Sequence, residues 1–193
     1  MTRHRLVIIF ALVVIVLAAA LIMYLPRLTR PRGTAVSTEA TPTGAAASPG
    51  RRITATLFFV GEDGLSLEPV QREVPFGEAV GDQARFIAEA QVADAPAPYA
   101  SAMPAGTTVR AVYVTDKGEA FVDLSAEATT GHSGGTLDEL LAVYAIVNAL
   151  TVNLPAVTRV QILVDGKEVD TLAGHVDLRQ PLSKNLTWTK STP

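Results

Sequence analysis

The 193-residue sequence contains no cysteine. This absence excludes disulfide bonds, metal sites built from thiolates and a cysteine nucleophile. It also excludes attachment to a membrane through a lipid-modified cysteine.

Charged residues are absent from residues 6–25, LVIIFALVVIVLAAALIMYL. A helix of this length spans about 30 Å, which matches the hydrocarbon core of a bilayer. We therefore expect residues 6–25 to form a single transmembrane signal anchor. The alternative is a signal peptide cleaved near Ala18, Ala19 and Ala20, but the apolar run continues beyond them and is longer than the usual core of such a peptide.

Arginines flank this run on both sides, so the positive-inside rule does not decide its orientation. The short flank at residues 1–5 favours a cytoplasmic N-terminus, and hence a single-pass cell-membrane protein with an extracytoplasmic C-terminal domain. Residues 26–50 are rich in Pro, Thr, Ala, Ser and Gly and lack apolar periodicity, so we expect a disordered tether. The folded domain is expected at residues 51–187, followed by a tail at residues 188–193.

Positive charge is scarce in the expected domain. Residues 51–193 carry 11 Lys and Arg against 18 Asp and Glu, a net charge of −7. A domain with a net negative charge is repelled by the phosphate backbone of a nucleic acid, so we expect no nucleic-acid partner.

Residues 136–165 form the stretch around which the domain is organised. Apolar residues recur there at steps of three and four, which predicts a long buried helix that ends before Pro155. Thr136 and Glu139 have the spacing of a capping box at its start. Residues 160–164 alternate as in a strand, and Asp165-Gly166 predicts a tight hairpin with residues 167–172.

The other elements follow from local patterns. We expect strands at residues 53–60, 65–74, 108–115 and 119–124, a helix at residues 78–92, loops at residues 93–106 and 125–135, and an extended closing segment at residues 175–186. Pro69 marks the second strand as an edge strand. The order ββ-α-ββ-α-ββ predicts an α+β fold, with two helices packed on one face of one mostly antiparallel sheet.

Three segments, in this order and spacing, carry a family resemblance: ATLFFVGEDG, SAMPAGTTVRAVYVTDKGEAFVDLS and YAIVNALTVNLPAVTRVQILVDGKEVDTLAGHVDLRQPL. Over residues 53–186 the chain resembles the GerMN domain family, named from a sporulation and spore-germination protein. The resemblance implies a domain similar to the ring-building modules of secretion systems, placed outside the cytoplasmic membrane. One copy is present, whereas the namesake resembles a tandem pair.

Polar residues in the loops offer few candidates for chemistry. Residues 131–135, GHSGG, precede a helix and could bind an anion, although they lack the lysine of a phosphate-binding loop. Ser133, His175 and Asp177 could form a hydrolase triad, and His132, His175, Asp123 and Asp177 could ligate a metal, but neither set has the required motif or spacing. We therefore predict no catalytic, cofactor-binding or metal-binding residue.

Ala142, Ala145 and Ala149 share one face of the long helix. Small side chains allow another backbone to approach closely, so this face packs either inside the chain or against a second subunit in a weak self-association. The first functional hypothesis is a non-catalytic, membrane-anchored assembly module with envelope protein partners. The alternative is an extracytoplasmic module that binds a ligand or the cell wall through a groove near residues 93–106. The third functional hypothesis is a hydrolase.

Overall fold

The computed structural model describes residues 47–132 and 135–190. The elements, in chain order, are β1 (Ala47–Val60), β2 (Leu67–Gly77), α2 (Val80–Val92), β3 (Val109–Val114), β4 (Glu119–Leu124), α3 (Glu127–Thr130), α4 (Thr136–Asn153), β5 (Arg159–Val164), β6 (Lys167–Glu168) and β7 (Leu182–Ser183). Within this part of the chain no helix is both long and apolar enough to cross a membrane. The predicted anchor at residues 6–25 and most of the predicted tether lie outside the described residues.

The strands form two separate sheets. β1 and β2 make a long antiparallel hairpin, while β3, β4, β5 and β6 form a second sheet in that order, with β7 also paired to β5. β4 and β5 run parallel, and the other pairs are antiparallel. The prediction of an α+β fold is confirmed. The prediction of one mostly antiparallel sheet is wrong, because β1 and β2 pair only with each other among the named strands.

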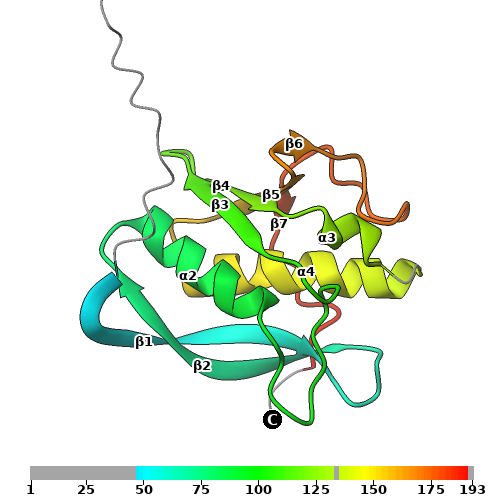
Figure 1. The fold of residues 1–193 in the computed structure, drawn as a ribbon, viewed down its shortest axis with the longest axis horizontal. Coiled ribbons are helices and arrows are strands. Elements are labelled where there is room, and N and C mark those ends of the chain that lie inside the picture. The colour runs from blue at the N-terminus through cyan, green and yellow to red at the C-terminus, as the bar shows by residue number, and fades with distance from the viewer. Residues whose placement is uncertain (1–46, 133–134, 191–193) are drawn as a thin grey trace, which may run out of the picture. The chain divides into compact units, whose positions relative to one another are not determined.

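Helices α2 and α4 lie between the two sheets (Figure 1). Each helix contacts the β1–β2 hairpin on one side and a strand of the larger sheet on the other: β3 for α2, and β5 for α4. The expectation that both helices cover one face of a single sheet is therefore wrong. The second sheet explains why α4 is apolar on most sides, since both of its flanks are covered.

The local signals place most boundaries correctly. α4 ends at Asn153, before Pro155, as predicted. Asp165 and Gly166 have φ angles of 50° and 74°, the left-handed pair that a two-residue hairpin requires. The returning strand is shorter than expected, and the loop expected at residues 125–135 contains the short helix α3.

The outer edge of β1 is closed by side-chain amides rather than by a strand. The Gln91 amide accepts the N–H of Phe58 at 2.8 Å and donates to its carbonyl at 2.7 Å. The Asn153 amide likewise accepts the N–H of Thr56 at 2.8 Å and donates to the carbonyl of Thr56 at 2.7 Å. The main chain of Ala100 completes the row by pairing with Val60. Side chains of helices α2 and α4 are thus hydrogen-bonded to the backbone of the hairpin.

The outer edge of β2 is met by the C-terminal segment. The Leu67 N–H donates to the carbonyl of Trp188 at 2.7 Å, and the Lys190 N–H donates to the carbonyl of Leu67 at 2.9 Å. The Lys190 ammonium also contacts Asp63 and Glu68. Residues 188–190, assigned from the sequence to a tail, therefore pack on the domain.

Candidate functional site

A pocket of about 270 Å³ opens beside the loop that joins α2 to β3. We call it the loop pocket. It is lined by Val60, Gly64, residues 100–104, Gly131, His132, Asp138 and Leu141. The groove expected near residues 93–106 and the glycine-rich segment before α4 therefore meet at one site.

Two contacts hold the walls of the loop pocket together. Ala100 exchanges two main-chain hydrogen bonds with Val60, at 2.9 Å and 3.0 Å, which ties the loop to the end of β1. Gly131 packs so closely on Pro104 that a Cβ atom there would lie 2.8 Å from the proline ring. A side chain at position 131 would therefore push the two walls apart.

His132 is the polar group of the pocket whose environment is most perturbed. Its Nε2 atom is buried and has no hydrogen-bond partner within the part of the chain that the structure describes. Burial lowers the pKa of His132 below its usual value of 6.5. The negative charges of Glu139 and Asp138 act in the opposite direction, but their effect is smaller. The imidazole is therefore neutral at pH 7 and can offer one ring nitrogen to a ligand.

Ser101 and His132 line the same pocket, but no described hydrogen bond joins the serine hydroxyl to the imidazole. The Ser101 hydroxyl accepts the N–H of Met103 at 3.2 Å, and Nε2 of His132 is unpartnered. A hydrolase needs its nucleophile hydrogen-bonded to the base. The described contacts therefore show no activated serine in the loop pocket.

Glu139 has a role that the sequence did not reveal. Gly135, with φ 122°, is the N-cap of α4, so the predicted capping box between Thr136 and Glu139 is wrong. The Glu139 side chain is 0% exposed and turns to the loop after β6. Its carboxylate accepts the N–H groups of Leu172, Ala173 and His175 at 2.7–2.9 Å.

The carboxylate of Glu139 also lies 3.2 Å from Nδ1 of His175. Burial alone would raise the pKa of Glu139, but the backbone hydrogen bonds outweigh it, so the pKa lies below its usual value of 4.5. Glu139 is thus a buried anion that fixes the loop to the start of α4. The sequence signal for it was the acidic pair Asp138 and Glu139, after which the helix carries no further charge.

Three of the residues proposed for a triad or a metal site, His175, Asp177 and Asp123, are engaged elsewhere. Ser133 lies outside the described residues. Asp177 makes a bidentate pair with Arg179, which lowers the pKa of Asp177 to about 2. Asp123 accepts the N–H of Gly166 at 2.7 Å and so supports the β5–β6 turn. Within residues 47–132 and 135–190, no three His, Asp or Glu side chains are placed to hold a metal.

Ala142, Ala145 and Ala149 are each 0% exposed. α4 packs against β1, α2, β5 and β7 of the same chain. The small-residue face therefore lies inside the domain and offers no free surface on it.

Comparison with known families gives one match. The family described as "Germane: Sporulation and spore germination" matches residues 56–170. This match confirms the resemblance drawn from the sequence motifs. No curated protein matches the chain.

Solved structures show the same fold. The first GerMN domain of the sporulation protein GerM from Bacillus subtilis is 21% identical, with a TM-score of 0.54, and the alignment covers 68% of this chain and 97% of that domain. The tandem GerMN domains of the same protein are 20% identical, with a TM-score of 0.54, and the alignment covers 69% of this chain and 46% of the tandem protein. This chain thus spans about half the length of the tandem protein.

Proposed function

The chain belongs to the Germane family of sporulation and spore germination, and from this membership we propose that it is a non-catalytic assembly module of the bacterial cell envelope. The module is anchored in the cell membrane by residues 6–25 and acts outside the cytoplasm, through contacts with other envelope proteins. In a spore-forming organism the assembly serves sporulation or germination. The family match is the observation that carries the proposal.

Three further features support this role. The uncharged run at residues 6–25 is long enough to cross a bilayer. The candidate triad residues His175 and Asp177 are bound to Glu139 and Arg179. Large apolar side chains also remain exposed at separate places on the domain, among them Val80, Tyr113 and Trp188. Tyrosine and tryptophan, the types of Tyr113 and Trp188, are enriched in protein–protein interfaces.

A photocrosslinking experiment tests the assembly role. A photoreactive amino acid replaces Val80, Tyr113 or Trp188, one at a time, in the full chain expressed in its own organism. We expect envelope proteins to be captured from at least one of these positions, and exposed Glu62 serves as the control position. If all four positions give the same background at normal abundance, the assembly role is wrong.

The second candidate function is binding of a small ligand or a cell-wall fragment in the loop pocket. The buried Nε2 atom of His132, which has no hydrogen-bond partner among the residues that the structure describes, is the observation that favours it. Retention of the chain on purified peptidoglycan tests this function. We expect His132→Ala to weaken retention and the exposed variant Glu62→Ala to leave it unchanged. Equal retention of both variants and the wild type would remove the loop pocket from consideration.

A further inference from the structure

β3 is an edge strand of the larger sheet. The strand order places β4 on one side of β3 and no described strand on its other side. The outer edge of β1 differs from this arrangement, since side-chain amides and Ala100 occupy it, and the C-terminal segment bonds the edge of β2 at Leu67. Other described strands also have an open edge, but among the named strands β3 is the one that carries an exposed large apolar side chain, Tyr113.

The backbone groups on this edge can be identified from the β3–β4 ladder. The Thr115 N–H donates to the carbonyl of Glu119 at 2.9 Å, which makes these two residues a hydrogen-bonded pair. Because such pairs alternate along an antiparallel ladder, Tyr113 also points its backbone groups toward β4, while Val112 and Val114 point theirs away. Within the described chain, no hydrogen bond reaches the outward groups of Val112 or Val114.

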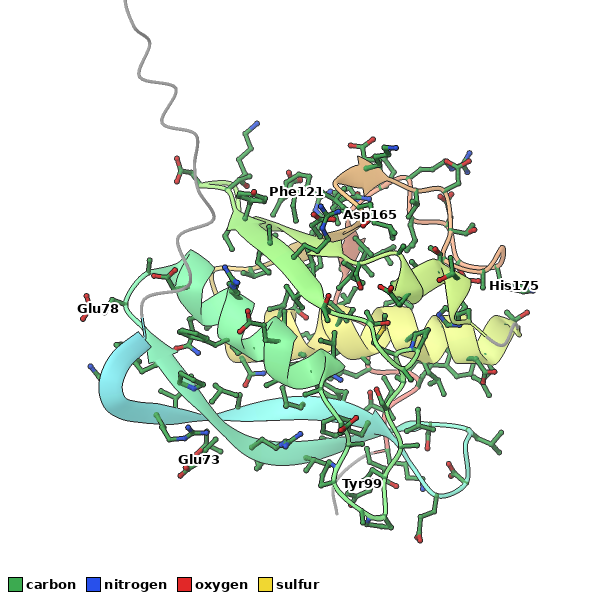
Figure 2. The ribbon with its side chains drawn as sticks, in the orientation of Figure 1. Glu73, Glu78, Tyr99, Phe121, Asp165 and His175 are labelled. Atoms are coloured by element: carbon green, nitrogen blue, oxygen red, sulfur yellow. The ribbon has the colours of Figure 1, made fainter. Side chains whose placement is uncertain are left out.

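The side chain at the centre of this edge is also uncovered. Tyr113 is 59% exposed. It lies directly opposite Phe121 in the ladder, and Figure 2 shows Phe121 on the face of the sheet turned away from the helices. An exposed tyrosine beside a half-buried phenylalanine, next to unpaired backbone groups, is a surface suited to the addition of a strand.

The sequence around Tyr113 is complementary to itself. Valines stand one residue to either side, Ala111 and Thr115 stand two residues away, and Arg110 and Asp116 stand three residues away. β3 has an irregularity at Arg110 and ends before Asp116, which lies in the turn. If two such strands pair antiparallel about Tyr113, the end of β3 with Arg110 lies beside the turn of the second copy that carries the oppositely charged Asp116. Arg110 already contacts Asp165 at 2.8 Å. A surface contact between Arg110 and Asp116 of the second copy therefore favours this register but adds little to the affinity.

We propose that β3 pairs antiparallel with β3 of a second copy of this chain, with the two Tyr113 residues opposite each other. The proposal rests on the assembly role proposed above and names one of its contacts. The outward groups of Val112 and Val114 form the new hydrogen bonds. Tyr113 and Phe121 of both copies then form one row of four aromatic side chains across the joined sheets.

A single-cysteine variant of the full chain tests this pairing. The native chain has no cysteine, so Tyr113→Cys introduces the only thiol. In the proposed register the two residues form a pair without hydrogen bonds between them, with Cα atoms about 4.5 Å apart. A disulfide bridges that distance. We expect mild oxidation of membranes containing this variant to give a covalent dimer.

Phe121→Cys is the matched control, because it lies on the same face, one strand further from the seam. Its thiols in the two copies would be three strand spacings apart, about 14 Å, which is too far for a disulfide. Equal dimer yields from the two variants, or no dimer from Tyr113→Cys, would overturn the pairing. The envelope crosslinks from other positions would still decide the assembly role independently.

Val114→Pro, added to Tyr113→Cys, tests whether the backbone forms the contact. Proline removes an N–H that the β3–β4 ladder does not use, and the melting temperature of the double variant reports its fold. We expect the folded double variant to lose most of the covalent dimer. An unchanged dimer yield would show that strand pairing does not bring the two copies together.

Discussion

At the scale of single residues, the domain depends on a buried charge. Glu139 is fully buried in an apolar helix, yet its two oxygens accept three backbone N–H groups and contact His175. Hydrogen bonds of this kind offset the cost of burying a carboxylate. The loop after β6 therefore takes its position from one side chain on α4.

We predict that Glu139→Gln destabilises the domain by about 1–3 kcal/mol, because the amide turns an N–H₂ group toward backbone donors that then lack an acceptor. Chemical denaturation of Pro42–Pro193, the compact unit that contains the domain, measures this loss. The exposed variant Glu62→Gln is the control and should stay within about 0.5 kcal/mol of the wild type. A Glu139→Gln variant as stable as the control would mean that the carboxylate does not hold the loop.

The same carboxylate predicts a pH dependence. Its pKa in the folded state is lowered from 4.5, so its contribution to stability is complete above that pH and is lost as the pH falls through and below it. The difference in unfolding free energy between wild type and Glu139→Gln should therefore shrink below about pH 4.5. Denaturation series at several pH values measure it, and a difference that stays constant down to about pH 3 would contradict this assignment.

At the scale of elements, the β1–β2 hairpin is joined to the helices by Gln91 and Asn153. Each amide replaces a neighbouring strand for one residue of β1. The sequence could not indicate this, because Gln91 and Phe58 are 33 residues apart and each side chain fits an ordinary helix or strand. Such contacts depend on tertiary placement rather than on a local pattern.

We expect Gln91→Met to cost about 2–4 kcal/mol, because it keeps the side-chain volume but leaves the N–H and carbonyl of Phe58 buried without partners. Gln71→Met is the matched control: Gln71 is exposed on β2, and its amide donates to the hydroxyl of Thr56. Thermal and chemical unfolding of the two variants should therefore differ clearly. Similar losses would show that the amide of Gln91 adds little to the attachment of α2.

The small-residue face of α4 gives a second prediction for an element. Ala145 is fully buried within the chain, so Ala145→Glu should place an unpaired carboxylate in the core and destabilise the monomer by several kcal/mol. Val152→Glu, on the same helix at a position that is 37% exposed, is the control and should cost less than about 1 kcal/mol. Sedimentation and thermal melts separate the two interpretations of this face. A folded Ala145→Glu monomer that had lost only self-association would assign the face to an interface.

At the scale of the whole molecule, the sequence predicted the elements better than their arrangement. α4 and the Asp165-Gly166 turn follow from local chemistry, namely apolar periodicity, Pro155 and the left-handed preference of Asp and Gly. The division into two sheets and the parallel pairing of β4 with β5 depend on strands distant in sequence. Alternation alone does not specify such partners.

The loop pocket was predicted in part for the same reason. The groove beside residues 93–106 and the glycine-rich segment before α4 were each identified as candidates, but their meeting at Pro104 and Gly131 is a tertiary contact. Glu139 was assigned to a cap because the capping-box pattern is local. Its actual partners lie more than thirty residues away, in a loop without a motif.

The membrane topology of the chain is the last prediction. If residues 6–25 are an uncleaved anchor with a cytoplasmic N-terminus, the two sides of this run must differ in access to a reagent that does not cross the membrane. Ser37→Cys and Thr2→Cys each provide a single thiol, because the chain has no cysteine of its own. We expect an impermeant maleimide to label the Ser37→Cys variant in intact cells, after permeabilisation of any outer membrane, and to label the Thr2→Cys variant only after lysis. The reverse pattern would invert the topology, whereas a shortened mature protein that has lost the thiol of the Thr2→Cys variant would identify a cleaved signal peptide. Either result would leave the fold unchanged but would refute the anchored module, since the domain would then lie in the cytoplasm or be released from the membrane.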